Sequence, residues 1–335
     1  MPLRTIEAVM KRARKRLLMW SACAACAACT AHSSTTSSPT ASQPTASSST
    51  ASAPAAGPVS LRIASAAELV AMGIVSSQYV EIRLAASPDG TMLLWGSTDR
   101  PGGAGGWDIW VSRRTGAAWG PPAAASFNSA ANDFDPAFSA DGRWVYFFSN
   151  RPGGFGGDDI YRAAVISEGF GPAQHLGPED NTAGDEWAPA PSPDGTQLLF
   201  ASNKPGAKHD LFIAPVRGDG FGPASPLPGA INTPDADEFD ATFLPDGSSL
   251  IFSRSRDVDN DPIELDFARR GPSGYDAGTP LPASVNVADG YTLGPSIDLH
   301  DPGVLYFSGK RPEAAAGKLD IYRVRYALDP SPMAR

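Results

Sequence analysis

The sequence has little cysteine, and all of it lies in one short stretch near the N-terminus. The three cysteines are Cys23, Cys26 and Cys29, so residues 30–335 contain none. A disulfide framework is therefore excluded for the body of the chain, which must be stabilised by packing. Histidine is also scarce, and the four histidines are scattered without the spacing of a zinc site: His32, His175, His209 and His300.

The sequence also lacks the positive charge of a nucleic-acid-binding protein. Residues 1–57 hold six of the 27 Lys and Arg residues and one of the 36 acidic residues, which leaves residues 58–335 with a net charge of −14. Such a surface repels phosphate backbones, so we expect no nucleic-acid partner.

Signatures of catalysis are missing as well. There is no Gly-x-Ser-x-Gly elbow, and no cysteine beyond residue 29 is available as a nucleophile. The glycine-rich runs 102–106 and 153–157 lack the Gly-Lys-Ser/Thr ending of a phosphate loop. We therefore predict no catalytic residues, no cofactor and no enzymatic activity.

The N-terminus has the pattern of an export signal. A basic block at residues 11–16 precedes an apolar run at residues 17–28, which is too short to span a bilayer. Both Met1 and Met10 are candidate starts. Cys26-Ala-Ala-Cys29 resembles a bacterial lipobox, although Cys26 stands where leucine is usual. We predict a signal peptide over residues 1–29 with lipidation of Cys29, and ordinary signal-peptidase cleavage within the alanine-rich run is the alternative.

The segment that follows, residues 30–57, consists almost entirely of Ser, Thr, Pro and Ala. Without large apolar side chains it cannot offset the entropy of ordering, so we predict a disordered tether. The protein is then expected to reside in the periplasm or at the outer membrane as a lipoprotein, in contact with the membrane through its lipid anchor only.

Residues 58–335 contain five copies of one repeat. A Ser-Pro-Asp-Gly-like turn recurs, and each turn is followed by a short apolar run that reads as a buried strand. Two further patterns follow in most copies: a glycine-rich hairpin that leads into an Asp-Ile-Tyr-like strand, and an aromatic-Gly-Pro stretch. The aspartates of the turns lie 52, 53, 52 and 55 residues apart: Asp89, Asp141, Asp194, Asp246 and Asp301.

Four short strands in each of five copies predict an all-β, five-bladed β-propeller, with six blades as the alternative. The fifth copy lacks a fourth strand, while residues 58–63 form a strand that belongs to no preceding copy. We predict that this N-terminal strand completes the last blade and closes the ring. A capping-box pattern at residues 65–68 predicts one short helix at residues 69–72.

The repeat resembles the TolB-type, WD-like propeller repeat of bacterial envelope proteins. Residues 149–161 read SNRPGGFGGDDIY and residues 181–186 read NTAGDE, both typical of that family. The resemblance implies residence in the periplasm or at the outer membrane, binding of a protein or an envelope polymer, and no cofactor. TolB itself carries an additional N-terminal domain for which this chain has no room, so we expect a protein that is not an orthodox TolB.

Two sets of acidic residues are candidate binding sites. The first opens the innermost strand of four copies and could form a ring of carboxylates at a mouth of the channel, for a cation or a basic peptide. Its alternative role is structural, by capping loop amides or pairing with the recurrent basic residues of a neighbouring blade. This set is Glu81, Asp133, Glu186 and Glu238, with Thr292 in the fifth copy.

The second set lies in the fourth hairpin, which has lost its glycines. Asp257, Asp259 and Asp261 alternate as at the start of a calcium loop, although Pro262 and Ala268 occupy positions where that motif needs Gly and Glu. Ca²⁺ binding is one hypothesis and a solvated acidic turn is the other. A third acidic position, occupied by Asp159 in the second copy, is predicted to stiffen the glycine-rich hairpin by accepting backbone N–H groups.

The sequence thus predicts a monomeric, envelope-anchored propeller that acts as a protein- or polymer-binding scaffold. The alternative is a glycoside-cleaving five-bladed propeller, for which the inner-strand acids Glu81, Asp133, Glu186 and Glu238 are the only plausible catalytic groups.

Overall fold

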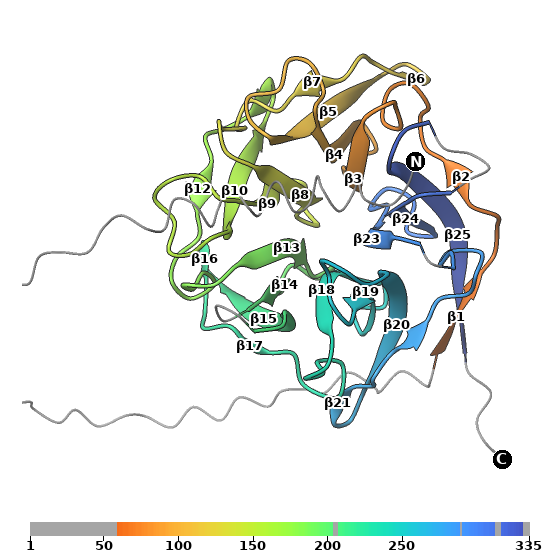
Figure 1. The fold of residues 1–335 in the computed structure, drawn as a ribbon. Helices are drawn as coiled ribbons and strands as arrows, with labels where there is room; N and C mark the ends of the chain where they lie inside the picture. The colour runs from red at the N-terminus through yellow and green to blue at the C-terminus, as the bar shows by residue number, and fades with distance from the viewer. Residues whose placement is uncertain (1–58, 204–206, 289, 312–315, 331–335) are drawn as a thin grey trace, which may run out of the picture.

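The computed structural model describes residues 59–203, 207–288, 290–311 and 316–330. These residues form five antiparallel sheets arranged in a ring around a central axis (Figure 1). The predicted all-β, five-bladed propeller is therefore confirmed, and the described residues contain five sheets rather than six. In these ranges no helix is long and apolar enough to cross a membrane. The predicted signal peptide, Cys29 and the tether lie outside the described residues.

In each blade the first three strands run in sequence order from the axis outward. The innermost strands are β3 (Val80–Ala86), β8 (Asp133–Phe138), β13 (Glu186–Pro191), β18 (Asp237–Phe243) and β23 (Thr292–Ile297). The second strands are β4 (Met92–Thr98), β9 (Trp144–Ser149), β14 (Gln197–Ser202), β19 (Ser249–Ser255) and β24 (Val304–Gly309). The third strands are β5 (Trp107–Thr115), β10 (Asp159–Ile166), β15 (Asp210–Arg217), β20 (Glu264–Gly271) and β25 (Asp320–Pro330).

The predicted fourth strand is present in the first four blades as two short pieces. In the first three blades a Gly-Pro step separates the pieces, because proline has no N–H to donate to the ladder. In the fourth blade residues 276–278 separate them without a proline. Both pieces pair with the third strand of their blade. The first pieces are β6 (Ala118–Trp119), β11 (Gly169–Phe170), β16 (Gly220–Phe221) and β21 (Gly274–Tyr275). The second pieces are β7 (Ala123–Ala124), β12 (Gln174–His175), β17 (Ser225–Pro226) and β22 (Thr279–Pro280).

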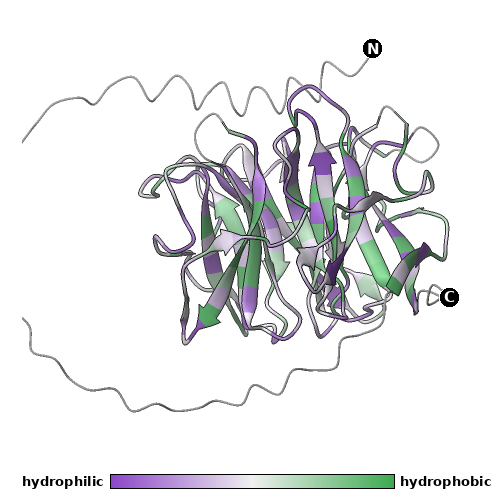
Figure 2. Cartoon of the chain, turned by 90° about the horizontal axis from the view of Figure 1, so that it is seen from below, coloured by the Kyte–Doolittle hydropathy of each residue, from purple (hydrophilic) through white to green (hydrophobic). Residues whose placement is uncertain are grey.

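The core lies between the blades and repeats with them. The aromatic residue of each predicted apolar run lies in a second strand, and all five of these side chains are at most 2% exposed. Figure 2 shows hydrophobic residues along the strands of neighbouring blades. Burial of one large aromatic side chain per blade supplies much of the driving force for stacking the sheets. These residues are Trp95, Phe147, Phe200, Phe252 and Phe307.

The glycine-rich hairpins are organised by the acid that opens the third strand. Asp159 accepts hydrogen bonds from the backbone N–H groups of Phe155 and Gly156, at 2.9 and 3.4 Å. A Cβ on Gly154 would lie 1.9 Å from Asp159 Oδ2, so only glycine fits there. Asp108 and Asp320 accept the corresponding bonds in their blades. The predicted structural role of this acid is confirmed in these three copies.

An asparagine fastens the connection between successive blades. Asn181 Oδ1 accepts a hydrogen bond from the Ile160 N–H at 2.6 Å, and its Nδ2 donates to the Ile160 carbonyl at 3.2 Å. The same pair of bonds recurs at Asn128, Asn232 and Asn286. In the fifth blade Ser76 replaces the asparagine and makes both bonds with Ile321.

The ring is closed by the N-terminal strand, as predicted. β1 (Val59–Ile63) pairs antiparallel with β25, with Val59 opposite Pro330 and Ile63 opposite Tyr326. The expected helix at residues 69–72 is wrong. β2 (Glu68–Leu69) instead pairs with Tyr322 and Arg323 of β25, because the open edge of the fifth blade offers more backbone hydrogen bonds than one isolated helical turn.

Removal of β1 tests this closure. Val59, Leu61 and Ile63 are half-buried against the fifth-blade core, so a chain beginning at residue 64 should lose roughly 3 kcal/mol of stability. It should also associate through the exposed edge of β25. Thermal melts and size-exclusion chromatography measure both effects against a control chain beginning at residue 58. Equal stability and an equal monomer fraction would show that β1 does not close the ring.

Candidate functional site

All five innermost strands share a backbone irregularity that shapes the centre of the molecule. The pairing register with the second strand shifts at the same place in every blade. In every inner strand the residue two positions after the predicted acid, or after Thr292 in the fifth blade, has a positive φ, which costs a non-glycine residue about 1–2 kcal/mol. A bulge of this kind re-aims a side chain. The residues are Arg83 (φ 45°), Asp135 (48°), Ala188 (51°), Asp240 (49°) and Gly294 (62°).

Three of these bulged residues are charged or acidic, and they interact across the axis. Arg83 of the first blade donates from Nη2 to the Ala241 carbonyl of the fourth blade, at 3.3 Å. Asp135 of the second blade shares a hydrogen bond with Asp240 of the fourth. Because these blades are not neighbours in the ring, their side chains meet in the central channel.

The two acids at the axis, Asp135 and Asp240, both have perturbed pKa values. Burial raises the pKa of both carboxyl groups, that of Asp135 well above its usual range. Asp240 Oδ2 also accepts a hydrogen bond from the Gly294 N–H, at 3.2 Å. The nearby Arg83 guanidinium opposes the rise of both pKa values.

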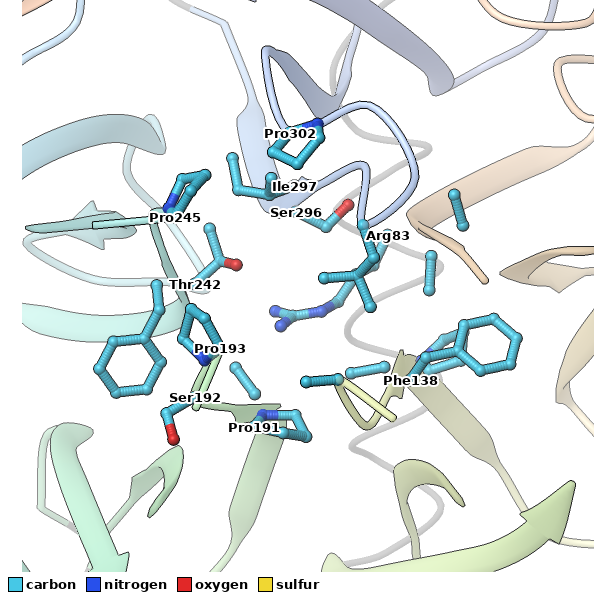
Figure 3. A pocket seen from close by; sticks show the side chains of 18 residues that line it. Arg83, Phe138, Pro191, Ser192, Pro193, Thr242, Pro245, Ser296, Ile297 and Pro302 are labelled. Carbon is cyan, nitrogen blue, oxygen red and sulfur yellow. The ribbon is translucent and has the colours of Figure 1, made fainter. Parts of the chain in front are cut away.

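A pocket opens above this cluster, at the end of the channel where the inner strands finish. Its volume is about 240 Å³, and Arg83 is part of its lining. Figure 3 shows the Arg83 side chain reaching toward the centre of the surrounding side chains. The rim is mostly apolar and rich in proline: Pro136, Phe138, Pro191, Pro193, Pro245, Ile297 and Pro302.

The predicted ring of acids occupies the opposite ends of the same strands. Glu81, Asp133, Glu186 and Glu238 are all fully buried, and each bonds within its own blade. Glu186, for example, accepts from the Thr182 N–H at 2.9 Å and from the hydroxyls of Thr182 and Ser202. Equivalent loop bonds reach Glu81, Asp133 and Glu238 from Ser77, Ser129 and Thr233.

Three of these acids also face an arginine of the same blade rather than of the neighbouring one. The pairs are Arg100–Glu81 at 3.9 Å, Arg151–Asp133 and Arg254–Glu238 at 3.0 Å. In the fifth blade Thr292 Oγ1 donates to the Val285 carbonyl at 3.4 Å. These contacts give the acids a structural task in anchoring loops, and a ligand-binding role for them stays a prediction.

The fourth hairpin arranges its aspartates separately. Asp257 accepts hydrogen bonds from the Asp259 N–H and the Asn260 side chain, at 3.0 and 2.7 Å. Asp261 Oδ2 lies 3.5 Å from Nε of Arg256, with which it forms an ion pair. No group of three His, Cys, Asp or Glu side chains in the described part of the chain is placed to hold a metal. Calcium binding by Asp257, Asp259 and Asp261 stays an untested hypothesis.

Sequence reasoning missed Arg83, Asp135 and Asp240. Each lies two residues after a predicted acid, in a position that reads Arg, Asp, Ala, Asp and Gly through the five copies. The variation at this position was the signal that could have identified these residues as functional candidates. A position that varies among otherwise similar blades is not needed to build every blade. Nothing in the sequence reports that the three side chains meet at the axis.

The burial of Glu81 gives a pH-dependent prediction. Desolvation raises the pKa of Glu81 to about 7, against the partly opposing bonds from Ser77 and the charge of Arg100. Between about pH 4.5 and 7 the folded state keeps a proton that the unfolded chain releases, so this group makes stability fall as pH rises. Glu81→Gln should remove that contribution, on the order of 1 kcal/mol per pH unit.

Denaturant unfolding of both proteins at several pH values measures the difference. The difference in unfolding free energy between Glu81→Gln and wild type should shift in favour of the variant from about pH 4.5 to 7 and stay constant above that range. A difference that is independent of pH would contradict the raised pKa.

Comparison with known proteins yields structural likenesses only. No protein-family model matches the sequence, and no curated protein matches it. Similar solved structures include a protein assigned as TolB from Agrobacterium tumefaciens, with 14% identity, a TM-score of 0.47, and coverage of 76% of this chain and 91% of that one. TolB from Acinetobacter baumannii has 14% identity, a TM-score of 0.46, and coverage of 76% and 58%.

An α-L-arabinofuranosidase from Podospora anserina is also similar, with 11% identity, a TM-score of 0.45, and coverage of 77% of this chain and 93% of that one. The structures similar to this chain thus include TolB proteins, as the repeat motifs predicted, together with a glycosidase. Values this low carry no argument about function, and the five-bladed fold rests on the strand pairing described above.

Proposed function

We propose that this protein is a ligand-binding component of the bacterial cell envelope and that its binding site is the central pocket. The observation that supports this proposal is the cavity of about 240 Å³ on the propeller axis, with an apolar rim and Arg83 at its floor. Concave, mainly apolar pockets with a few converging polar groups are the usual form of ligand sites.

The arrangement of the channel acids favours binding over glycoside cleavage. Asp135 and Asp240 are in hydrogen-bond contact with each other. The two carboxyl groups of a glycosidase instead stand about 5–10 Å apart, so that the sugar, or the sugar and a water, fit between them. Asp135 and Asp240 are also 4% and 3% exposed, which leaves little room for a substrate between them.

The cellular setting of the proposal comes from the N-terminal sequence. A signal peptide over residues 1–29, a lipid on Cys29 and a flexible tether over residues 30–57 would hold a monomeric propeller at the envelope membrane. The partner is then an envelope protein or polymer that presents a group small enough to enter the pocket.

The lipid anchor is tested by metabolic labelling. Cells that express the full chain and are fed a labelled fatty acid should incorporate label into the wild-type protein, and Cys29→Ala should abolish this incorporation. Cys23→Ala is the matched control and should still be labelled. An unlabelled wild type, or a labelled Cys29→Ala variant, would contradict the anchor.

The pocket itself is tested by filling it. Ala137 is half-buried and lines the cavity, so Ala137→Leu should occlude it with little effect on the fold. Purified wild type should capture an envelope component that Ala137→Leu fails to capture. Ala117→Leu, at an exposed turn of the first blade, is the control. Capture that is unaffected by Ala137→Leu would place the binding surface elsewhere, and glycan hydrolysis by the wild type would favour the enzymatic alternative.

A further inference from the structure

The central pocket contains a cation without a complete set of partners, and this feature identifies a class of ligand. Resting on the function proposed above, we propose that the pocket receives a ligand with a small apolar body and a carboxylate group, and that Arg83 binds the carboxylate. The carboxylate can belong to a free acid or to the C-terminal residue of a peptide, since both present the same group.

The state of Arg83 is the first argument. Its side chain is fully buried, at 1% exposure, yet Nε and Nη1 have no hydrogen-bond partner. Only Nη2 is engaged, by the Ala241 carbonyl at 3.3 Å. Buried guanidinium N–H groups that lack partners are unfavourable, so a ligand that supplies an acceptor gains a strong, charge-assisted hydrogen bond.

The fold does not require an arginine at position 83. Arg83 holds a left-handed conformation, with φ at 45°, in which the equivalent residues of the third and fifth blades are Ala188 and Gly294. The propeller therefore forms this bulge without an arginine. The long charged side chain is additional to what the fold requires at this place.

The neighbouring acids do not accept hydrogen bonds from Nε or Nη1 of Arg83. Asp135 and Asp240 hydrogen-bond to each other, and Asp240 also accepts the Gly294 N–H. Burial raises the pKa of both acids, which reduces the negative charge that they offer to the guanidinium. The free donors of Arg83 are left for an acceptor that arrives from the pocket, and an anionic acceptor best matches a cation in a medium of low dielectric constant.

The walls of the pocket define the rest of the ligand. The prolines of the rim have no N–H to offer, and the Ser296 hydroxyl already donates to the Leu84 carbonyl. An apolar ligand body therefore fits this lining better than a polyhydroxylated sugar. The volume of about 240 Å³ lies just below the range of about 300–1,000 Å³ for drug-sized ligands, which favours a small acid or a chain end.

Calorimetric titration with matched probes tests the proposal. The free-acid arm compares 4-methylpentanoate with 4-methylpentanamide, and the peptide arm compares N-acetyl-alanyl-leucine with its C-terminal amide. In at least one arm the acid should bind wild-type protein about tenfold or more tightly than the amide, as expected for one charge-assisted hydrogen bond. The arm that binds more tightly identifies the source of the carboxylate.

Two variants separate the role of Arg83 from that of the cavity. Arg83→Ala should remove the preference for acid over amide while preserving the fold, because Ala188 already adopts this backbone conformation. Ala137→Leu should weaken acid and amide alike. Arg143→Ala, which removes an arginine with a 78% exposed side chain, should leave the preference intact.

Equal binding of acid and amide, an acid preference that survives Arg83→Ala, or no binding in either arm would overturn the proposal. Any of these results would leave the proposed function intact if the wild type still captured an envelope component and Ala137→Leu did not. The pocket would then bind a ligand without a carboxylate. Loss of pocket-dependent capture together with intact acid binding would instead overturn the envelope partner and retain the carboxylate site.

Discussion

The convergence of five strands on one narrow axis is the constraint on which the rest of this structure depends. Each inner strand meets it with a bulge whose central residue has a left-handed backbone. Three blades place Arg83, Asp135 and Asp240 at that point, so that a basic side chain and two acidic side chains are buried together on the axis. They coexist because burial raises the pKa of both hydrogen-bonded acids, which reduces the negative charge at the axis.

The two ends of the inner strands carry different kinds of residue. At their start, Glu81, Asp133, Glu186 and Glu238 tie the preceding loop to the blade through backbone and hydroxyl hydrogen bonds. At their end, prolines and apolar side chains surround the pocket. The repeated turns supply part of the pocket rim, for example Pro193 and Pro245, whereas the charged residues at its base, Arg83, Asp135 and Asp240, distinguish one blade from another.

Sequence reasoning predicted the blades well because the signals are local. A turn, an apolar strand and a glycine hairpin each span a few residues, and the role of Asp159 in its hairpin needs only its own blade to be explained. The prediction of a helix at residues 69–72 was wrong because residues 68–69 pair with the edge of β25. A local sequence pattern does not reveal this long-range pairing. The role of Asn181 was missed for a related reason, since its partner Ile160 lies in another strand.

The sequence by itself determined the number of blades, the order of their strands and closure by residues 58–63, because repetition and a surplus strand are visible in one dimension. Only the tertiary structure decided what occupies the axis. Whether Arg83 reaches Ala241, and whether Asp135 meets Asp240, depends on the distance between blades that are neither adjacent in the ring nor close in sequence. The burial that raises the pKa of Asp135 and leaves Arg83 with free donors is a property of the closed ring, and no single repeat contains it.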